Sequence, residues 1–139
     1  MDFRIQTHAA NRHYTGHHFF LLSKGKHAGR PMTAPCPNSF VVQCLDENDR
    51  TELYWICYCL WQSRQFKRLL VGSVIPFLRI HEATTVIMKG IVHSGQNREA
   101  RIENISAFEK LQSVENNLKQ TLKLIAHQRE VLAAQYLKP

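Results

Sequence analysis

Short stretches of apolar and aromatic residues recur through the first two thirds of the chain and predict a small β-sheet. Four stretches share this composition: residues 3–6, 17–23, 39–44 and 84–88. β-branched and aromatic side chains favour the pleated, half-buried surface of a strand. Residues 24–38, between the second and third stretches, hold two glycines and three prolines and therefore predict a series of turns.

The longest apolar run in this part of the chain predicts a helix over residues 53–70, because eighteen residues exceed the length of an ordinary strand. Asp49 and Glu52 form a D-x-x-E pattern that is typical of a helix start. Gly72 and Ser73 are expected to end the helix, since glycine is common just after the last helical turn.

The clearest element is the last one, a helix predicted over residues 107–137, which contain no glycine or proline. Ser106 and Glu109 form a capping box at its start, and the polar residues 89–101 before it predict a turn. At 1.5 Å per residue this helix would span about 46 Å. It must either project and pack along another helix or fold back over the sheet, and both arrangements remain open.

One face of this helix is apolar and is expected to bind a protein partner or a second copy of the chain. The residues of this face are Leu111, Leu118, Leu122, Ile125 and Leu132. Gln128 and Gln135 interrupt a strict heptad, so the pattern favours an antiparallel or bundle-like pairing over a two-stranded zipper.

Together these elements predict an α+β fold, with a small mixed β-sheet, one packed helix and a long C-terminal helix. Residues 1–103 are expected to form one globular domain and residues 104–139 the long helix. The longest unbroken apolar run, residues 53–61, is far shorter than the roughly 20 residues that span a bilayer. The N-terminus carries no apolar secretory segment, so a cytoplasmic protein is expected.

Charge adds the first functional information, because 18 Lys and Arg residues against 11 Asp and Glu residues give a net charge of +7. The excess is concentrated in residues 1–44 (+4) and 60–101 (+5), on either side of an acidic stretch at 45–59 (−3). Such a protein attracts polyanions by charge and by counterion release, although a solvated basic surface without a partner is the alternative. The candidate phosphate contacts are Lys24, Lys26, Arg30, Arg64, Lys67, Arg68 and Arg79.

The sequence predicts no metal site, no cofactor and no enzymatic activity. The four cysteines form no C-x-x-C pair, and five of the eight histidines lie in the first 27 residues at spacings that match no zinc motif. The candidate catalytic groups, Cys36 with a nearby histidine or His17 with Asp46, stand at no spacing that predicts a shared pocket. The carboxylates gather in residues 46–52, whereas a metal nuclease needs them to converge from several strand ends.

The second half of the chain resembles a known family. The stretch LYWICYCLWQSRQFKRLLVGSVIPFLR contains S-x-x-F at residues 63–66 and G-S-x-I-P-x-L at residues 72–78, followed by the expected strand and the long helix. In this order and spacing, residues 53–137 resemble the second half of a target-recognition domain from a type I restriction–modification specificity subunit. The resemblance implies binding to duplex DNA, with the long helix as a spacer and a methyltransferase-type protein as a partner.

The N-terminal part resembles a different family. The run KGKHAGRPMTAPCPNSFVV, residues 24–42, looks like the signature of a small uncharacterised bacterial family, and this resemblance implies no activity. Basic residues around two glycines are typical of a loop that contacts phosphates. A rigid connector between two strands is the alternative interpretation of this run.

We therefore predict a non-catalytic DNA-binding module, linked to a restriction–modification system, that holds a basic face against duplex phosphates and docks a partner through its C-terminal helix. Gly72, Ser73 and Pro76 are expected to shape the turn that supports the basic side chains. The alternative is an interaction or scaffold protein that uses the long helix and binds no nucleic acid. Salt-dependent binding to duplex DNA would separate the two.

Overall fold

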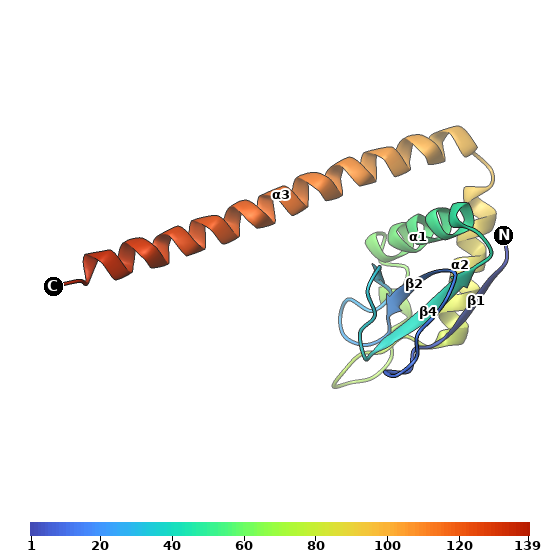
Figure 1. Ribbon diagram of the computed structural model, residues 1–139. Coiled ribbons are helices and arrows are strands. Elements are labelled where there is room, and N and C mark those ends of the chain that lie inside the picture. Colours follow the sequence, from blue (N-terminus) through green and yellow to red (C-terminus); the bar gives the residue numbers. More distant parts are fainter. The chain divides into compact units, whose positions relative to one another are not determined.

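The computed structural model describes residues 1–139, which divide into two compact units, Met1–Gln96 and Asn97–Pro139. The first unit holds a four-stranded sheet and two α-helices, and the second holds one long helix (Figure 1). The protein thus has the predicted α+β fold. The boundary between the units follows Gln96, whereas the sequence placed it after residue 103. No helix combines the length and the apolar character that crossing a membrane requires.

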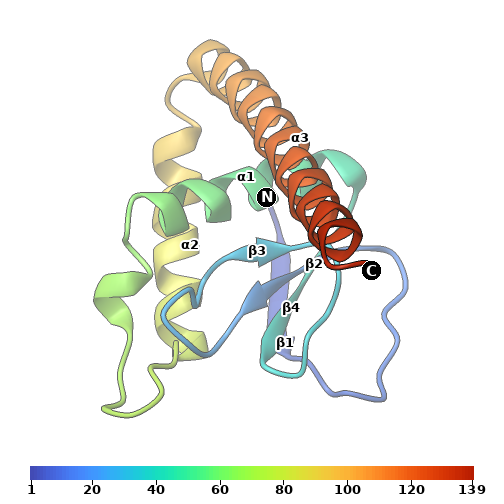
Figure 2. The ribbon, with the colours of Figure 1, turned by 90° about the vertical axis from the view of Figure 1, so that its left-hand side faces the viewer.

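The sheet of the first unit is wholly antiparallel, not mixed as predicted. Its strands are β1 (Phe3–Thr7), β2 (His17–Leu22), β3 (Pro31–Met32) and β4 (Ser39–Cys44), in the order β1-β4-β2-β3 (Figure 2). Parallel strands need a long crossover, usually a helix. Residues 84–88 were expected to add a strand after such a crossover helix, but they are helical. The remaining strands therefore pair only in antiparallel orientation.

Helix α1 (Glu47–Gln62) begins and ends earlier than predicted. The side chain of Asp46 caps it by accepting a hydrogen bond from the backbone N–H of Asp49 at 2.8 Å, so Asp49 lies inside the first turn. A separate 3₁₀ turn, η1 (Lys67–Leu69), follows after a break in the helix. The predicted helix over residues 53–70 joined these two elements because neither glycine nor proline marks the break.

Helix α2 (Ile80–Ser94) stands where a strand was predicted at residues 84–88, and that prediction is wrong. The run TTVIM is rich in β-branched residues, which suggests a strand when the run is considered alone. Ala83 and Ile87, four residues apart, are both fully buried in the core that α1 also lines. Burial of one helical face therefore overrides the local preference for a strand.

The core lies between one face of the sheet and the two helices α1 and α2. Alternate residues of β2 and β4 point to this face, because successive side chains of a strand point to opposite sides. The buried residues of the core include Phe19, Leu21, Phe40 and Val42 from the sheet and Leu53, Ile56, Cys57, Leu60, Ala83 and Ile87 from the helices. Burying each large apolar side chain contributes roughly 1.5–3 kcal/mol.

The opposite face of the sheet is covered by an aromatic cluster around Phe20. The rings of His8, Tyr14 and His18 lie with their centroids 5.4 to 6.0 Å from the centroid of Phe20. Tyr14 comes from the long connection between β1 and β2, so this connection shields Phe20 from solvent. Two of the N-terminal histidines therefore have a packing role.

Helix α3 (Arg98–Tyr136) forms the second unit and starts earlier than predicted. The side chain of Asn97 caps it, and Ser106, the predicted cap, lies within the helix. The turn predicted over residues 89–101 is reduced to residues 95–97, because α2 and α3 extend into it from both ends. None of the side chains of α3 is buried, and its 39 residues extend over about 58 Å.

Candidate nucleic-acid interface

A basic loop between β2 and β3 forms the first side of the candidate site. Residues 24–30 fold back on the preceding strand, and the backbone N–H of Gly29 donates to the carbonyl of Leu22 at 2.6 Å. Gly25 and Gly29 have φ angles of 94° and 96°, which residues with a side chain rarely adopt. The two glycines therefore allow the tight reversal that gives this loop its conformation.

The segment that follows α1 forms the second side, and Phe66 joins it to the loop. Phe66 is fully buried, and a Cβ atom added to Gly29 would overlap its side chain. Only glycine permits so close an approach of the backbone to the ring. This contact brings the 24–30 loop next to residues 64–67, which are distant in the sequence.

Arg64 holds an unusual backbone conformation directly after α1, with a φ of 64°. The backbone N–H of Gln65 donates to the carbonyl of Leu60 at 2.9 Å, and that of Arg64 donates to the carbonyl of Trp61 at 3.0 Å. This pair of bonds is the Schellman motif, in which glycine usually occupies the left-handed position. An arginine in this position costs roughly 1–2 kcal/mol in backbone energy. Because the position holds arginine and not glycine, the sequence carried no signal for the end of the helix.

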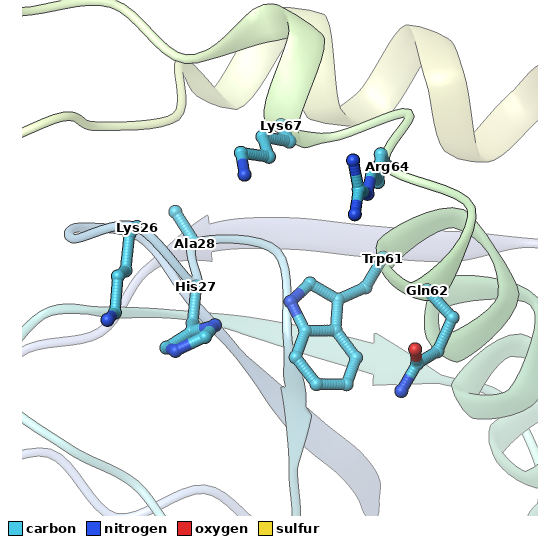
Figure 3. A pocket seen from close by; sticks show the side chains of 7 residues that line it. All are labelled: Lys26, His27, Ala28, Trp61, Gln62, Arg64 and Lys67. Atoms are coloured by element: carbon cyan, nitrogen blue, oxygen red, sulfur yellow. The ribbon is translucent and has the colours of Figure 1, made fainter.

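A pocket of about 250 Å³ lies between these two segments (Figure 3). It is lined by Lys26, His27, Ala28, Trp61, Gln62, Arg64 and Lys67. The rings of His27 and Trp61 meet edge to face, with their centroids 6.2 Å apart. Arg64 and Lys67 extend toward the pocket from the segment after α1, and Lys26 comes from the loop on the other side. The lining includes three cationic side chains and no carboxylate, so its electrostatic field favours an anion.

The structure brings together three of the seven predicted phosphate contacts, namely Lys26, Arg64 and Lys67. The other four lie outside the pocket lining: Lys24, Arg30, Arg68 and Arg79. Arg79 precedes α2, and its Nε atom lies 3.8 Å from Oε2 of Glu82, which partly offsets its charge.

Four lining residues, His27, Ala28, Trp61 and Gln62, were not among the predicted contacts. Helical spacing gives no signal here, because α1 ends at Gln62 and Arg64 has a left-handed backbone conformation. These residues line the pocket because two distant segments pack together, and neither segment signals this contact alone.

The turn expected to support the basic side chains is present. Val71 and Phe77 exchange two backbone hydrogen bonds, with N–O distances of 3.0 and 2.8 Å, and Gly72 within the turn has a φ of 102°. The backbone N–H of Gly25 donates to the carbonyl of Pro76 at 2.7 Å, which ties the turn directly to the basic loop. Gly72 thus shapes this turn and does not end a helix, as it was predicted to do.

A second polar cluster joins β2 to the start of α1. His17 Nδ1 lies 3.0 Å from Glu47 Oε2, and Arg50 Nε donates to the same oxygen at 2.9 Å. Hydrogen bonds from Arg50 and His17 lower the pKa of Glu47 from 4.5 to about 2. His17 therefore contacts Glu47 and not Asp46, which caps the helix. No group of three or more His, Cys, Asp or Glu side chains in residues 1–139 is placed to hold a metal ion.

The predicted partner-binding residues all lie on α3, and between 44% and 65% of their surface is exposed. They are Leu111, Leu118, Leu122, Ile125 and Leu132. Charge is distributed unevenly along this helix: residues 103–115 contain three glutamates and one lysine, and residues 119–129 contain three cations and no acid. The helix therefore has an acidic segment and a basic segment, both of which accompany the apolar stripe.

The fold and the pocket define a small α+β domain with a basic, aromatic-lined pocket and an additional long helix. The chain belongs to the family described as "Family of unknown function (DUF6943)", which it matches over residues 5–135. This one family covers the run at 24–42 and nearly all of residues 53–137, for which the sequence suggested two different resemblances. One element of the restriction-subunit resemblance, the strand at 84–88, is helical. No curated protein matches the sequence.

Proposed function

We propose that this protein is a non-catalytic DNA-binding module that neutralises backbone phosphates with Lys26, Arg64 and Lys67. The observation that carries the proposal is the meeting of these three cations, from two distant segments, around one pocket without a carboxylate. Each cation that contacts a phosphate displaces condensed counterions, and this release drives binding to nucleic acid of any sequence. A link to a restriction–modification system is part of the proposal and rests on the resemblance around residues 72–78.

The test is the salt dependence of binding to a labelled duplex. Three phosphate contacts contribute about 2.7 to the slope of log affinity against log salt, because each contributes about 0.9. Replacing Lys26, Arg64 and Lys67 with alanine should therefore flatten the slope by up to about 2.7 and weaken binding to all sequences alike. Fluorescence anisotropy over a range of salt concentrations measures both effects.

A matched control removes the same net charge from elsewhere in the first unit. Arg4, Arg12 and Lys89 are exposed and lie outside the pocket lining. Their triple replacement with alanine should leave most of the slope in place. Equal loss in both triple variants would indicate a general effect of net charge, and the absence of any binding to duplex at low salt would contradict the proposal.

The second part of the proposed function is that α3 docks a second copy of the chain in antiparallel orientation. Antiparallel pairing places the acidic residues 103–115 of one copy against the basic residues 119–129 of the other, whereas parallel pairing places Glu115 opposite Glu115. The pairing would also cover Leu118 and Leu122, which are 60% and 65% exposed. Burying each leucine contributes roughly 1.5–3 kcal/mol.

Replacing Leu118 and Leu122 with glutamate should convert a dimer into a monomer while the first unit stays folded. Light scattering gives the mass, and cooperative unfolding of the first unit gives the control. A wild type that is monomeric alone and forms a complex with a methyltransferase-type protein would identify that partner as the occupant instead. A dimer that binds no DNA would favour the scaffold function, for which the exposed stripe of α3 is the supporting observation.

A further inference from the structure

We propose that the pocket takes one unpaired base of a DNA strand, stacked on the indole of Trp61, while the flanking phosphates lie on the surrounding cations. This inference rests on the proposed function and names the form of DNA that the site selects. It gives a role to three of the four lining residues that the charge pattern did not indicate, namely His27, Trp61 and Gln62.

Trp61 carries the argument, because it lines the pocket and also packs against the core. Its position in the last turn of α1 fixes the ring, and His27 supports the ring edge to face. Aromatic side chains in such positions stack on the bases of single strands, since every base presents a flat face. Trp61 is thus a rigid aromatic surface beside three cations.

The size and polarity of the pocket fit a single base, whereas a duplex can contact the surrounding cations only through its phosphates. Its volume of about 250 Å³ corresponds to roughly eight water molecules in the liquid, which is room for one ring system with its sugar. In a duplex both faces of a base are covered by its neighbours, so a base reaches Trp61 only from a strand end, a gap or a flipped position. The amide of Gln62 can both donate to and accept from the edge of such a base.

The cations lie on two sides of the Trp61 ring. A DNA strand that passes through the site carries a phosphate on each side of the stacked base, so it needs cations on both sides. Lys26 comes from the loop, and Arg64 and Lys67 come from the segment after α1 (Figure 3). The contact of Gly29 with Phe66 and the Schellman motif at Arg64 hold these two segments in place. Preorganised walls reduce the entropy lost on binding, so a small site can still favour one kind of ligand.

The experiment compares four probes with the wild-type protein at one low salt concentration. The probes are a thymidine strand of about ten nucleotides, an abasic strand of equal length with the same phosphates, a blunt duplex of that length, and thymidine monophosphate. The thymidine strand should bind roughly five- to a hundredfold more tightly than the abasic strand. It should also quench tryptophan fluorescence, and the abasic strand should not.

Variants of pocket residues test whether the pocket causes the difference in affinity between the thymidine and abasic strands. Trp61→Ala should remove the preference for the thymidine strand and leave the affinity for the abasic strand unchanged, and Trp61→Phe should restore most of the preference. Because Trp61 also packs on the core, its alanine variant is compared with Gln62→Ala, whose side chain is exposed. Gln62→Ala should reduce the same preference while the protein unfolds at the wild-type denaturant concentration.

Three outcomes would overturn the inference, and each has a different meaning. Equal affinity for the thymidine and abasic strands would exclude base stacking and leave phosphate binding, and hence the proposed function, intact. Equal affinity for the monophosphate and the thymidine strand would assign the pocket to a free nucleotide. The absence of binding to all four probes would reject both the inference and the proposed function.

Discussion

The two units of the protein use the same sequence signal, apolar residues three and four positions apart, with opposite results. In the first unit Leu53 and Ile87 have no exposed surface, because sheet and helices enclose them. In the second unit Leu118 and Leu122 are 60% and 65% exposed on a helix without a buried side chain. Amphipathic periodicity therefore predicts a helix and its apolar face, but it does not predict whether that face is buried within its own unit.

The stability of the two units has different origins. The first unit gains its stability from buried area, which scales with the apolar surface removed from water. The second unit depends on local terms, such as its Asn97 cap and the Lys119–Glu115 ion pair at 2.7 Å, each of which contributes about 1 kcal/mol or less. Burial of apolar area therefore stabilises the first unit and contributes little within α3.

The largest expected effect comes from the core of the first unit. Phe66→Ala should lower the free energy of unfolding by about 3–5 kcal/mol, because it removes a fully buried ring and leaves a cavity. Leu118→Ala, on the exposed stripe, should change the unfolding of the first unit by no more than about 0.5 kcal/mol. Urea denaturation at a protein concentration that keeps the chain monomeric measures both values, and similar losses would remove the distinction between the units.

The next effect concerns the contact that builds the pocket. Gly29→Ala should lower the free energy of unfolding by about 2–4 kcal/mol, because the new methyl group overlaps Phe66 and the residue has a positive φ. Gly25→Ala is the matched control, since Gly25 has nearly the same φ with nothing within 4 Å of the added atom. It should cost only about 1 kcal/mol. Equal losses would show that backbone strain alone, and not the approach to Phe66, constrains the loop.

A smaller effect is electrostatic: it is present at neutral pH and is lost in acid. Arg50 and His17 hold the pKa of Glu47 near 2, below its ordinary 4.5, so the ionised form is favoured in the folded state. The stabilisation is therefore fully present above about pH 4.5 and is lost as the pH falls through about 2. Glu47→Gln should be less stable than the wild type at neutral pH, and the difference should shrink over this range. A difference that does not depend on pH, in urea titrations from pH 7 to 2, would contradict this account.

Local sequence patterns were enough to predict most of the sheet and the existence of the long C-terminal helix. The apolar stretches at residues 3–6, 17–23 and 39–44 are strands with nearly the predicted limits, because the preference of aromatic and β-branched residues for strands acts locally. The long C-terminal helix was predicted for the same reason, since its uninterrupted helical periodicity needs no other part of the chain. Three pocket cations were among the predicted residues because charge is visible without a structure.

The helical state of residues 84–88 and the composition of the pocket depend on contacts between distant segments. A β-branched run became helical because Ala83 and Ile87 found a core to enter, and such a core is formed by residues distant in the sequence. Lys26 meets Arg64 and Lys67 because Gly29 lies against Phe66, a contact that neither segment signals alone. Local patterns determine what a segment can form, whereas the burial and close packing of distant segments determine which of those forms is most stable and which side chains meet.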